Sequence, residues 1–414
     1  MTKKIAIIGS GISGLVSASL LSERYDVSLF EANDYLGGHT HTVDVEISGS
    51  TYPIDTGFIV FNKKTYPHFC KLLQKYNVPI QQSEMSFSYR SDAKNLEYNG
   101  NNLNTLFADR RNLIKPNFYY FLKEILRFNK AAKKFLTHPM DINITINEFI
   151  HNNRYSKDFI NHYLVPMIAS IWSKTSNDVM QCSAHFVLTF CENHGLLDIY
   201  DRPQWYTITN GSRSYIPLLT EKIRNKIYLN TKIERIERHP NHVTLKSTTD
   251  SYIFDYVIIA THSDQALQML DHPTDEEQNV LSAIPYKEND VILHTDINVM
   301  PKRKLAWASW NYLDNGNSLP TLTYYMNRLQ SINSPHHFCV SVNLMEHIAE
   351  DKVIQRFKYA HPAFNSHAII AQQQQKLING KNNTYYAGSY WGYGFHEDGV
   401  KSALNACEAL GVSL

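Results

Sequence analysis

The sequence predicts an α/β protein in which a doubly wound parallel sheet is interleaved with a second domain of α+β type. Three observations predict this class. An apolar run at residues 4–8 leads into a glycine-rich turn and a helical pattern, and a strand-like run at residues 385–389 leads into another glycine turn near the opposite end. Between these two runs, helical and aromatic sequence is followed by alternating strand patterns.

The first glycine turn has the spacing of a dinucleotide-binding loop. It consists of Gly9, Ser10, Gly11, Ile12, Ser13 and Gly14. Gly9 permits a tight turn after the strand, Gly11 lets the backbone approach a pyrophosphate, and Gly14 lets the next helix lie close to the sheet. The helix that begins near Gly11 directs its free N–H groups and the positive end of its dipole at phosphates. The sequence therefore predicts a Rossmann-like domain.

An acidic residue ends the next predicted strand. Residues 27–30 form an apolar run that leads to Glu31, at the spacing of about 20 residues expected for the carboxylate that binds ribose hydroxyls. A carboxylate there would repel a 2′-phosphate, so FAD or NAD is favoured over NADP.

The residues after Glu31 carry a resemblance to a known family. Ala32 follows it, and the pair Gly37 and Gly38 comes after a six-residue step, with His39 next. This pattern resembles the flavin amine oxidase superfamily, which includes phytoene desaturases and protoporphyrinogen oxidases. The resemblance implies bound FAD, with the glycine pair beside its diphosphate. Many amine oxidases have arginine after the pair, whereas this chain has His39.

The resemblance extends along the whole chain. Residues 55–58 match the segment that passes near the isoalloxazine ring, residues 254–261 match the middle strand, and residues 388–400 match the closing motif. The cofactor-binding residues predicted in this chain are Gly9, Ser10, Gly11, Ile12, Ser13, Gly14, Glu31, Ala32, Gly37, Gly38, His39, Gly57, Phe58, Ile233, Gly388, Glu397, Asp398, Gly399 and Val400.

A narrower resemblance concerns residues 55–62, 306–312 and 394–399. These segments look like a bacterial group of NAD/FAD-binding proteins whose members tend to accompany cyclopropane-fatty-acyl synthase-like enzymes. The resemblance implies a connection with lipid acyl chains.

Two domains are predicted to alternate along the chain. The FAD-binding domain is assigned residues 1–70, 205–269 and 379–414. The substrate domain is assigned a helical part at residues 71–204 and a sheet part at residues 270–378.

The predicted chemistry is hydride transfer from a substrate C–H bond to flavin N5. A helix whose first turn begins at Asp398 and Gly399 would stabilise negative charge near N1 and C2=O of the reduced ring. His294 and His396 are the candidate catalytic residues; the alternatives are a satisfied core histidine for His294 and a loop cap for His396. No cysteine lies in the closing motif, so the FAD is expected to be non-covalent.

Aromatic residues predict an apolar substrate cavity, for which Trp172, Tyr325 and Trp391 are the candidate wall residues. The predicted function is FAD-dependent oxidation or desaturation of a hydrophobic substrate, with a lipid acyl chain as the first choice. Two alternatives remain open: an amine oxidase acting on a small amine, and a non-catalytic flavin-binding partner of a lipid-modifying methyltransferase.

Charge and composition restrict the partners. The formal net charge is +1, from 40 basic and 39 acidic residues, so no nucleic acid is expected. The five cysteines show no CxxC pairing, and no metal site is predicted. The interrupted apolar run at the N-terminus predicts no cleaved signal, and no apolar stretch of about 18 residues predicts a transmembrane helix. A cytoplasmic protein is expected.

One segment suggests a membrane contact. Residues 110–135 combine eight basic residues with a single acidic one, Glu124, and with interleaved aromatic residues. A basic amphipathic helix of this kind can lie on an anionic bilayer, here the inner face of the membrane. The alternative is a helix that packs its apolar side on the core and presents a solvated basic face.

Overall fold

A five-stranded parallel sheet organises one half of the molecule in the computed structural model, which describes residues 2–317 and 319–414. Its strand order is β10-β2-β1-β14-β20. The strands are β1 (Lys4–Ile8), β2 (Asp26–Phe30), β10 (Ile227–Tyr228), β14 (Tyr256–Ile259) and β20 (Thr384–Tyr386). The sheet therefore joins three separated parts of the chain, and the predicted α/β class is confirmed.

The alternation of side chains along β1 divides this half into two cores. Ile5 and Ile7 point into a cluster formed with the helices α1 (Ile12–Leu21) and α16 (His396–Ala409). Ala6 and Ile8 point into a second cluster beneath the antiparallel sheet β11-β12-β13 and the helix α11 (Ser263–Met269). Both faces of β1 are buried, as is typical of central strands in parallel sheets.

The segment at residues 254–261, expected to be the middle strand, contains the end of one strand and the whole of another. The three-stranded sheet contains β11 (Ile233–Arg238), β12 (Val243–Ser247) and β13 (Ser251–Phe254), and β14 then begins at Tyr256. Asp255 separates them, because its N–H donates to the carbonyl of Lys4 while its carboxylate accepts the N–H of Lys4, at 3.0 and 2.7 Å. This exchange leads the chain from one sheet into the other.

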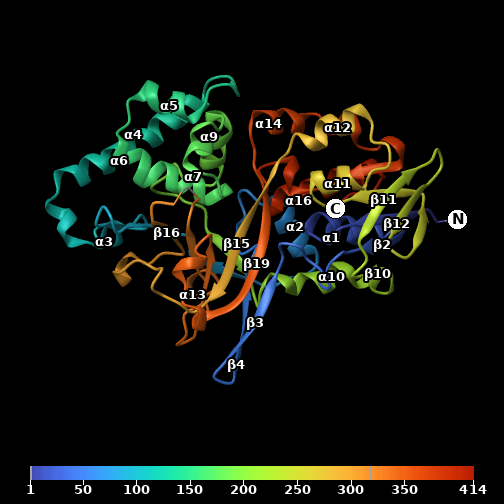
Figure 1. Cartoon of the computed structure of the whole chain (residues 1–414), viewed down its shortest axis with the longest axis horizontal. Helices are drawn as coiled ribbons and strands as arrows, with labels where there is room; N and C mark the ends of the chain where they lie inside the picture. Colours follow the sequence, from blue (N-terminus) through green and yellow to red (C-terminus); the bar gives the residue numbers. More distant parts are fainter. Residues whose placement is uncertain (1, 318) are drawn as a thin grey trace.

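A seven-stranded mixed sheet organises the other half, in the order β19-β15-β18-β17-β16-β7-β8. Its strands are β7 (Phe87–Ser91), β8 (Leu96–Asn99), β15 (Tyr286–His294), β16 (Trp310–Asp314), β17 (Leu322–Tyr325), β18 (Cys339–Val342) and β19 (Val353–Pro362). Residues 71–204, which were predicted to be helical, thus also contribute the strands β7 and β8. Long β15 and β19 run between the two halves (Figure 1).

Helices form a separate lobe above the mixed sheet (Figure 1). Its main helices are α4 (Pro116–Leu136), α5 (Ile146–Asn153), α7 (Val165–Trp172) and α9 (Ala184–Asn193). Phe128 of α4, Phe149 of α5 and Ile168 of α7 meet in one buried cluster. The amphipathic helix predicted within residues 110–135 is therefore present as α4, and its apolar side packs on the lobe's core.

The remaining strands and helices are short. The strands are β3 (Thr42–Ile47) and β4 (Ser50–Asp55), which form a hairpin, and β5 (Phe61–Asn62), β6 (Ile80–Ser83) and β9 (Trp205–Ile208), which form a small sheet. The helices are α2 (Pro67–Lys75), α3 (Leu103–Leu106), α6 (Lys157–Phe159), α8 (Ser176–Met180), α10 (Ile216–Thr220), α12 (Asp275–Ser282), α13 (Met326–Leu329), α14 (Ser366–Gln373) and α15 (Gln375–Ile378). Within the described residues, none of the helices has the length and apolar character needed to cross a membrane.

Asp55, at the end of β4, is a buried connection between segments. Its Oδ1 accepts hydrogen bonds from the Oγ1 of Thr42 at 2.6 Å and from the N and Oγ of Ser212 at 2.8 and 2.9 Å. Its Oδ2 accepts from the Nε2 of Gln330 at 3.2 Å. Burial raises the pKa of this carboxyl to about 6, although the Thr42 and Ser212 donors oppose the rise.

We predict that Asp55→Ala lowers the free energy of unfolding by about 3 kcal/mol, because it leaves several buried donors without an acceptor. Asp44→Ala is the matched control: Asp44 lies on the neighbouring strand β3 and pairs at the surface with Arg213, an interaction worth less than about 1 kcal/mol. Chemical denaturation of the two variants measures the difference. Equal destabilisation would show that Asp55 is not the connection described here.

Candidate functional site

Three chain segments meet at the carboxyl edge of the parallel sheet. They follow β1, β14 and β20, and they contain Gly9, Ala260 and Gly388. A Cβ atom on Gly9 would lie 2.7 Å from the carbonyl oxygen of Ala260, and the φ of Gly9 is +95°, so only glycine fits this turn. In open α/β sheets, ligands bind at this edge.

The glycines of the first turn have different environments. A Cβ on Gly14 would lie 1.9 Å from the carbonyl oxygen of Gly9, so Gly14 is required for α1 to lie on the turn. Gly11 is the N-cap of α1, with φ −62°, and no atom lies within 4 Å of its Cβ position. Gly9 and Gly14 thus serve the fold, while the open space at Gly11 is suited to a phosphate group. Ser10, Ile12 and Ser13 are buried in the same turn.

Glu31 is held firmly at the end of β2. Its Oε2 accepts from the N and Oγ of Ser10 at 2.9 and 2.5 Å, and its Oε1 accepts from the N and Nδ2 of Asn33 at 2.9 Å each. The backbone carbonyl of Glu31 accepts from Thr231, which leads into β11, where Ile233 is buried. The structure therefore brings Glu31 and Ile233 into one region, with Ala32 exposed beside them.

The glycine pair runs along the first turn. The N–H of Gly37 donates to the carbonyl oxygen of Ser10 at 3.1 Å, and a Cβ on Gly38 would lie 3.2 Å from the Cα of Gly11. The carbonyl of His39 then accepts from the N–H of Phe58 at 2.7 Å. The two loops predicted to touch the cofactor therefore lie together beside Gly11.

His39 has an unusual environment for a histidine. Its ring centre lies 5.0 Å from that of Tyr359, 5.2 Å from that of His361 and 6.5 Å from that of His262. Its Nε2 is buried and has no hydrogen-bond partner. Burial, reinforced by the neighbouring histidines, lowers the pKa of His39 well below its usual value, so the free ring is neutral.

The closing motif joins the first turn through its helix. Ser13 donates to the carbonyl oxygen of Gly399 at 3.0 Å, and a Cβ on Gly399 would lie 2.7 Å from the Cγ2 of Ile12. The N-termini of α1 and α16 therefore lie together. Helix α16 begins at His396, two residues earlier than predicted, because Asp398 closes the preceding loop by accepting from the N–H groups of Tyr393 and Phe395 at 3.0 Å.

The predicted cofactor residues of α16 contribute mainly through the backbone. Glu397 directs its carboxylate away from the first turn, since it accepts from the N–H groups of His68 and Phe69 and so caps α2. Burial raises the pKa of Asp398 to about 6. Val400 is buried in the core beside α1. The N–H groups in the first turn of α16 are the groups that this helix can offer to a ligand.

His396, a candidate catalytic residue, lies within this arrangement. Its Nε2 is 2.8 Å from the hydroxyl of Tyr215 and 3.2 Å from that of Thr40. Its ring stacks on Phe58, with centres 3.6 Å apart. Burial lowers the pKa of His396 to about 3, so the ring is neutral near pH 7.

His294, the other candidate, lies elsewhere, at the end of β15. It is fully buried; its Nε2 is 2.8 Å from the Oγ of Ser341, and its Nδ1 accepts from the N–H of Asp296 at 3.1 Å. Burial lowers its pKa to about 4. Both ring nitrogens are therefore engaged, and the geometry fits the alternative of a satisfied core histidine.

The three candidate cavity residues lie in two separate clusters. Trp172 donates from its Nε1 to the carbonyl of Tyr393 at 3.0 Å within the core of the helical lobe, against which Trp391 also packs. Tyr325 belongs to a small cluster with Trp307, and its hydroxyl lies 2.7 Å from the Nδ1 of His337. The structure thus brings Trp172 and Trp391 to one core and leaves Tyr325 apart from them.

Buried polar atoms at the carboxyl edge provide a test of whether the site fits a dinucleotide. Atoms without a partner include the Nε2 of His39, the Oγ of Ser263, the hydroxyl of Tyr390 and the Nε1 of Trp391. His39 and Ser263 lie in segments at this edge, whereas Tyr390 and Trp391 pack in the adjoining core. Leaving such atoms unpaired costs about 1–3 kcal/mol each. A ligand with a polar outline would supply partners for His39 and Ser263, so these residues fit the predicted cofactor.

Several residues of this region were not singled out from the sequence. They are His262, which stacks on Tyr286, and Thr40, Tyr215, Tyr359 and His361. Tyr359 and His361 come from β19, far along the chain from His39. Single tyrosines and histidines in strands carry no motif, so no sequence signal pointed to them.

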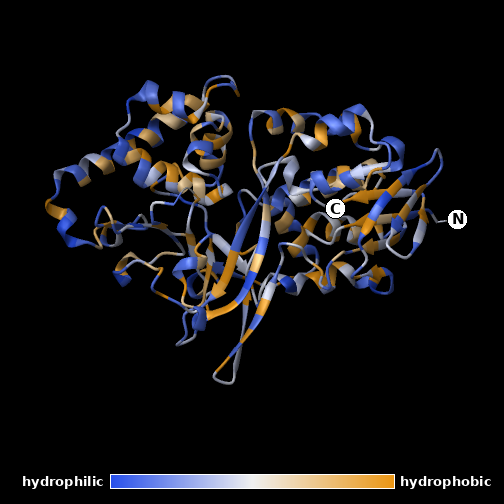
Figure 2. Cartoon of the chain, viewed as in Figure 1, coloured by the Kyte–Doolittle hydropathy of each residue, from blue (hydrophilic) through white to orange (hydrophobic). Residues whose placement is uncertain are grey.

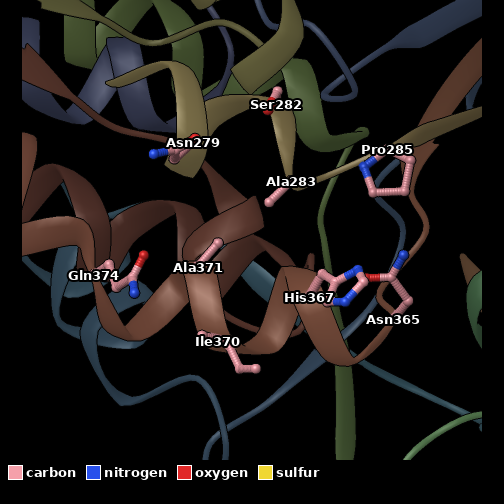
Figure 3. Close-up of a pocket in the computed structure, with 9 residues that line it drawn as sticks. All are labelled: Asn279, Ser282, Ala283, Pro285, Asn365, His367, Ile370, Ala371 and Gln374. Carbon is pink, nitrogen blue, oxygen red and sulfur yellow. The ribbon is translucent and has the colours of Figure 1, made fainter. Parts of the chain in front are cut away.

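A hollow of about 500 Å³ lies outside this site, between α12 and α14 (Figure 3). Its lining includes Asn279, Ser282, His367 and Gln374. None of the residues that line it is a predicted cofactor-binding residue, so we assign no ligand to the hollow.

The fold and the site define a doubly wound dinucleotide-binding protein with two helix N-termini at one ligand site. The sequence profile of the family described as flavin containing amine oxidoreductase matches residues 12–357. The chain belongs to this family, and its cofactor is FAD. The resemblance identified from the sequence is therefore confirmed, whereas the association with cyclopropane synthase-like enzymes stays a prediction.

Curated relatives share parts of the chain. A 1-hydroxycarotenoid 3,4-desaturase from Flavobacterium sp. is 41% identical over 88 residues, which are 21% of this chain and 16% of that protein. An L-amino-acid oxidase from Siganus canaliculatus is 22% identical over 327 residues, 70% of this chain and 56% of that protein. The chain thus spans little more than half the length of this longer relative.

Solved structures are similar over the whole chain. Cyclohexylamine oxidase from Brevibacterium oxydans matches with a TM-score of 0.71 and 16% identity, covering 99% of this chain and 100% of that one. A CLA-producing fatty acid isomerase from P. acnes matches with a TM-score of 0.68 and 16% identity, covering 98% of each chain. At this identity the likeness establishes the fold.

We predict that Gly11→Val gives a folded protein whose FAD content is lower by about tenfold or more, because a side chain would fill the space that the phosphates need. The absorbance of flavin relative to protein measures this, and the wild-type FAD should be released by acid as a non-covalent cofactor.

Gly14→Ala is the contrasting variant, because its Cβ would meet the backbone of Gly9. This variant should lose about 3 kcal/mol of stability. A yellow Gly11→Val protein would contradict the assignment.

Proposed function

We propose that the protein is an FAD-dependent oxidoreductase that oxidises or desaturates a hydrophobic substrate, and that this substrate is a lipid acyl chain. The observation that carries the proposal is the use of carboxylates around the site. Glu31, Asp55, Glu397 and Asp398 each accept hydrogen bonds from protein N–H or hydroxyl groups. Their oxygens are already engaged, so they are poorly suited to bind the charge of a substrate ammonium group.

The histidines near the site support the same choice. Burial lowers the pKa values of His39, His262, His361 and His396, so these rings are neutral near pH 7. A wall of neutral rings is better suited to an apolar substrate than to an anion. The relatives are consistent with this choice in part, since one is named a carotenoid desaturase and another a fatty acid isomerase.

The mechanism places few demands on acid–base groups. Bound FAD supplies an acceptor for hydride at its N5 position. The residues of the chain position the substrate C–H bond and exclude water, with Phe58 and the stacked ring of His396 as the proposed inner surface. The N–H groups in the first turn of α16 would stabilise negative charge that develops on the ligand beside them.

Two other functions are outcomes of the test. An amine oxidase is supported by the names of two relatives, a cyclohexylamine oxidase and an L-amino-acid oxidase. A non-catalytic flavin-binding partner of a lipid-modifying methyltransferase is supported by the lack of an evident base, since His294 and His396 both engage their Nε2 atoms with hydroxyls.

We predict that phospholipid with a monounsaturated acyl chain bleaches the flavin absorbance of the holoprotein under anaerobic conditions, whereas cyclohexylamine and L-amino acids leave it unchanged over the same time. Mass spectrometry of the lipid should then show the loss of two hydrogens per flavin reduced. Bleaching by an amine alone would establish the amine oxidase reading. Bleaching by none of these compounds, in a protein that chemical reductants still bleach, would contradict the proposal.

A further inference from the structure

One end of the molecule exposes a group of large apolar side chains. Its residues belong to α3, to the turn that follows it and to the start of α4, at the end opposite the parallel sheet (Figure 1). Ile114 is 85% exposed, Leu103 is 75% exposed and Tyr120 is 55% exposed, with Leu113 and Tyr119 near half. Figure 2 shows hydrophobic and hydrophilic residues side by side at this end.

These side chains are not needed for the core beneath them. Phe118, Phe121 and Phe128 fill the inner side of α4 and are each at most 5% exposed. Tyr119, Tyr120 and Lys123 lie on the outer side of the same helix. Tyr119 also contacts the core residue Phe107, so substitutions of Tyr120 and Lys123 are the ones that leave the packing of the helical lobe intact.

The charges that surround the apolar group are positive. Arg110, Arg111, Lys115 and Lys123 are exposed, whereas the acids of the same segment, Asp109 and Glu124, are 2% and 1% exposed. Among the residues that the structure describes, no carboxylate pairs with Arg110, Lys115 or Lys123. Asp109 pairs with Arg111 at 2.7 Å, so the positive field of this surface comes from Arg110, Lys115 and Lys123.

A second segment, distant in sequence, extends the same surface. Arg303 lies 3.0 Å from an oxygen of Glu97 and 3.4 Å from an oxygen of Asp109, which ties residues 302–305 to this end. Lys304 and Leu305 are exposed there. Asp92, which is half-exposed nearby, is already paired with Arg90 and Lys302. We call residues 103–123 and 302–305 together the basic tip.

We propose that the basic tip docks on an anionic lipid bilayer, with Leu113, Ile114 and the two tyrosines at the level of the headgroups. Apolar residues flanked by cations match a surface that is anionic outside and hydrocarbon inside, and tyrosine is suited to the boundary. A nucleic acid would use the cations and leave Leu103 and Ile114 in water. The docking depends only on these surface residues, so it holds whether or not the proposed reaction is correct.

The test is partition of the holoprotein onto vesicles, measured by sedimentation and followed by flavin absorbance. The wild-type protein should bind vesicles of phosphatidylglycerol mixed with phosphatidylcholine, and salt should release it. The triple variant Lys115→Gln, Lys123→Gln and Lys304→Gln should bind about a hundredfold more weakly, at about fivefold for each cation. Ile114→Ser should weaken binding by about tenfold or more.

Matched controls come from the opposite half of the molecule. Lys232, Lys376 and Lys381 are exposed, and their change to glutamine alters the net charge by the same amount. Leu377 is 48% exposed on α15, so Leu377→Ser is the control for Ile114→Ser. All control variants should bind vesicles like the wild type.

Three results would overturn the proposal. They are equal binding of the tip and control variants, equal binding to vesicles of phosphatidylcholine alone, and binding to duplex DNA without binding to vesicles. Because partition is measured without turnover, failure of this proposal is distinguishable from failure of the proposed reaction, which is read from flavin bleaching.

Discussion

The close approach of two helix N-termini is the constraint on which the rest of the structure depends. Helix α1 can lie against the glycine turn because Gly14 has no Cβ atom. A Cβ there would lie only 1.9 Å from the carbonyl oxygen of Gly9. Helix α16 can lie against α1 because Gly399 has no Cβ atom. A Cβ there would lie 2.7 Å from the Cγ2 of Ile12. These contacts bring the two ends of a 414-residue chain to one edge of the sheet. Two helix dipoles and their free N–H groups then point at one place, where an anionic cofactor is stabilised.

The polar groups around this cofactor site are of two kinds: carboxylates that the protein engages, and neutral groups that have no partner. The carboxylates are engaged by the protein itself, as Asp55 is by Thr42 and Ser212. Neutral groups, including the Nε2 of His39 and the Oγ of Ser263, are buried without partners. Unpaired neutral groups are suited to a ligand with many polar atoms, such as FAD. Carboxylates whose oxygens are already engaged are poorly suited to bind an amine, which favours an apolar substrate in the proposed reaction.

Much of the cofactor half could be predicted from the sequence, because its geometry depends on glycine. A turn that needs Gly9 and Gly14, and a loop that needs Gly37 and Gly38, leave a local pattern that spacing alone reveals. The strands β1 and β2 were predicted within one residue for the same reason, since each is a short apolar run before a turn.

The remainder of the site depends on contacts between distant segments. Tyr359 and His361 reach His39 only because β19 pairs with β15, and no local pattern marks them. The role of Glu397 as the cap of helix α2, and that of Asp398 as the residue that closes the loop at Phe395, could not be distinguished from ligand contacts without the positions of α2 and Phe395. Likewise, β7 and β8 were missed in a region dominated by helical patterns, because short strands of Ser, Tyr and Asn carry a weak alternation. The basic tip shows the same dependence, since residues 302–305 join residues 103–123 only through tertiary contacts.

A crystal structure of the holoprotein tests most directly whether the two ends of the chain form one FAD site. We expect the diphosphate to lie between Gly11 and Gly38, at the N-termini of α1 and α16, and the Nε2 of His39 to have gained a hydrogen-bond partner. A diphosphate bound away from Gly11, or FAD that contacts α1 and leaves the first turn of α16 in solvent, would contradict it.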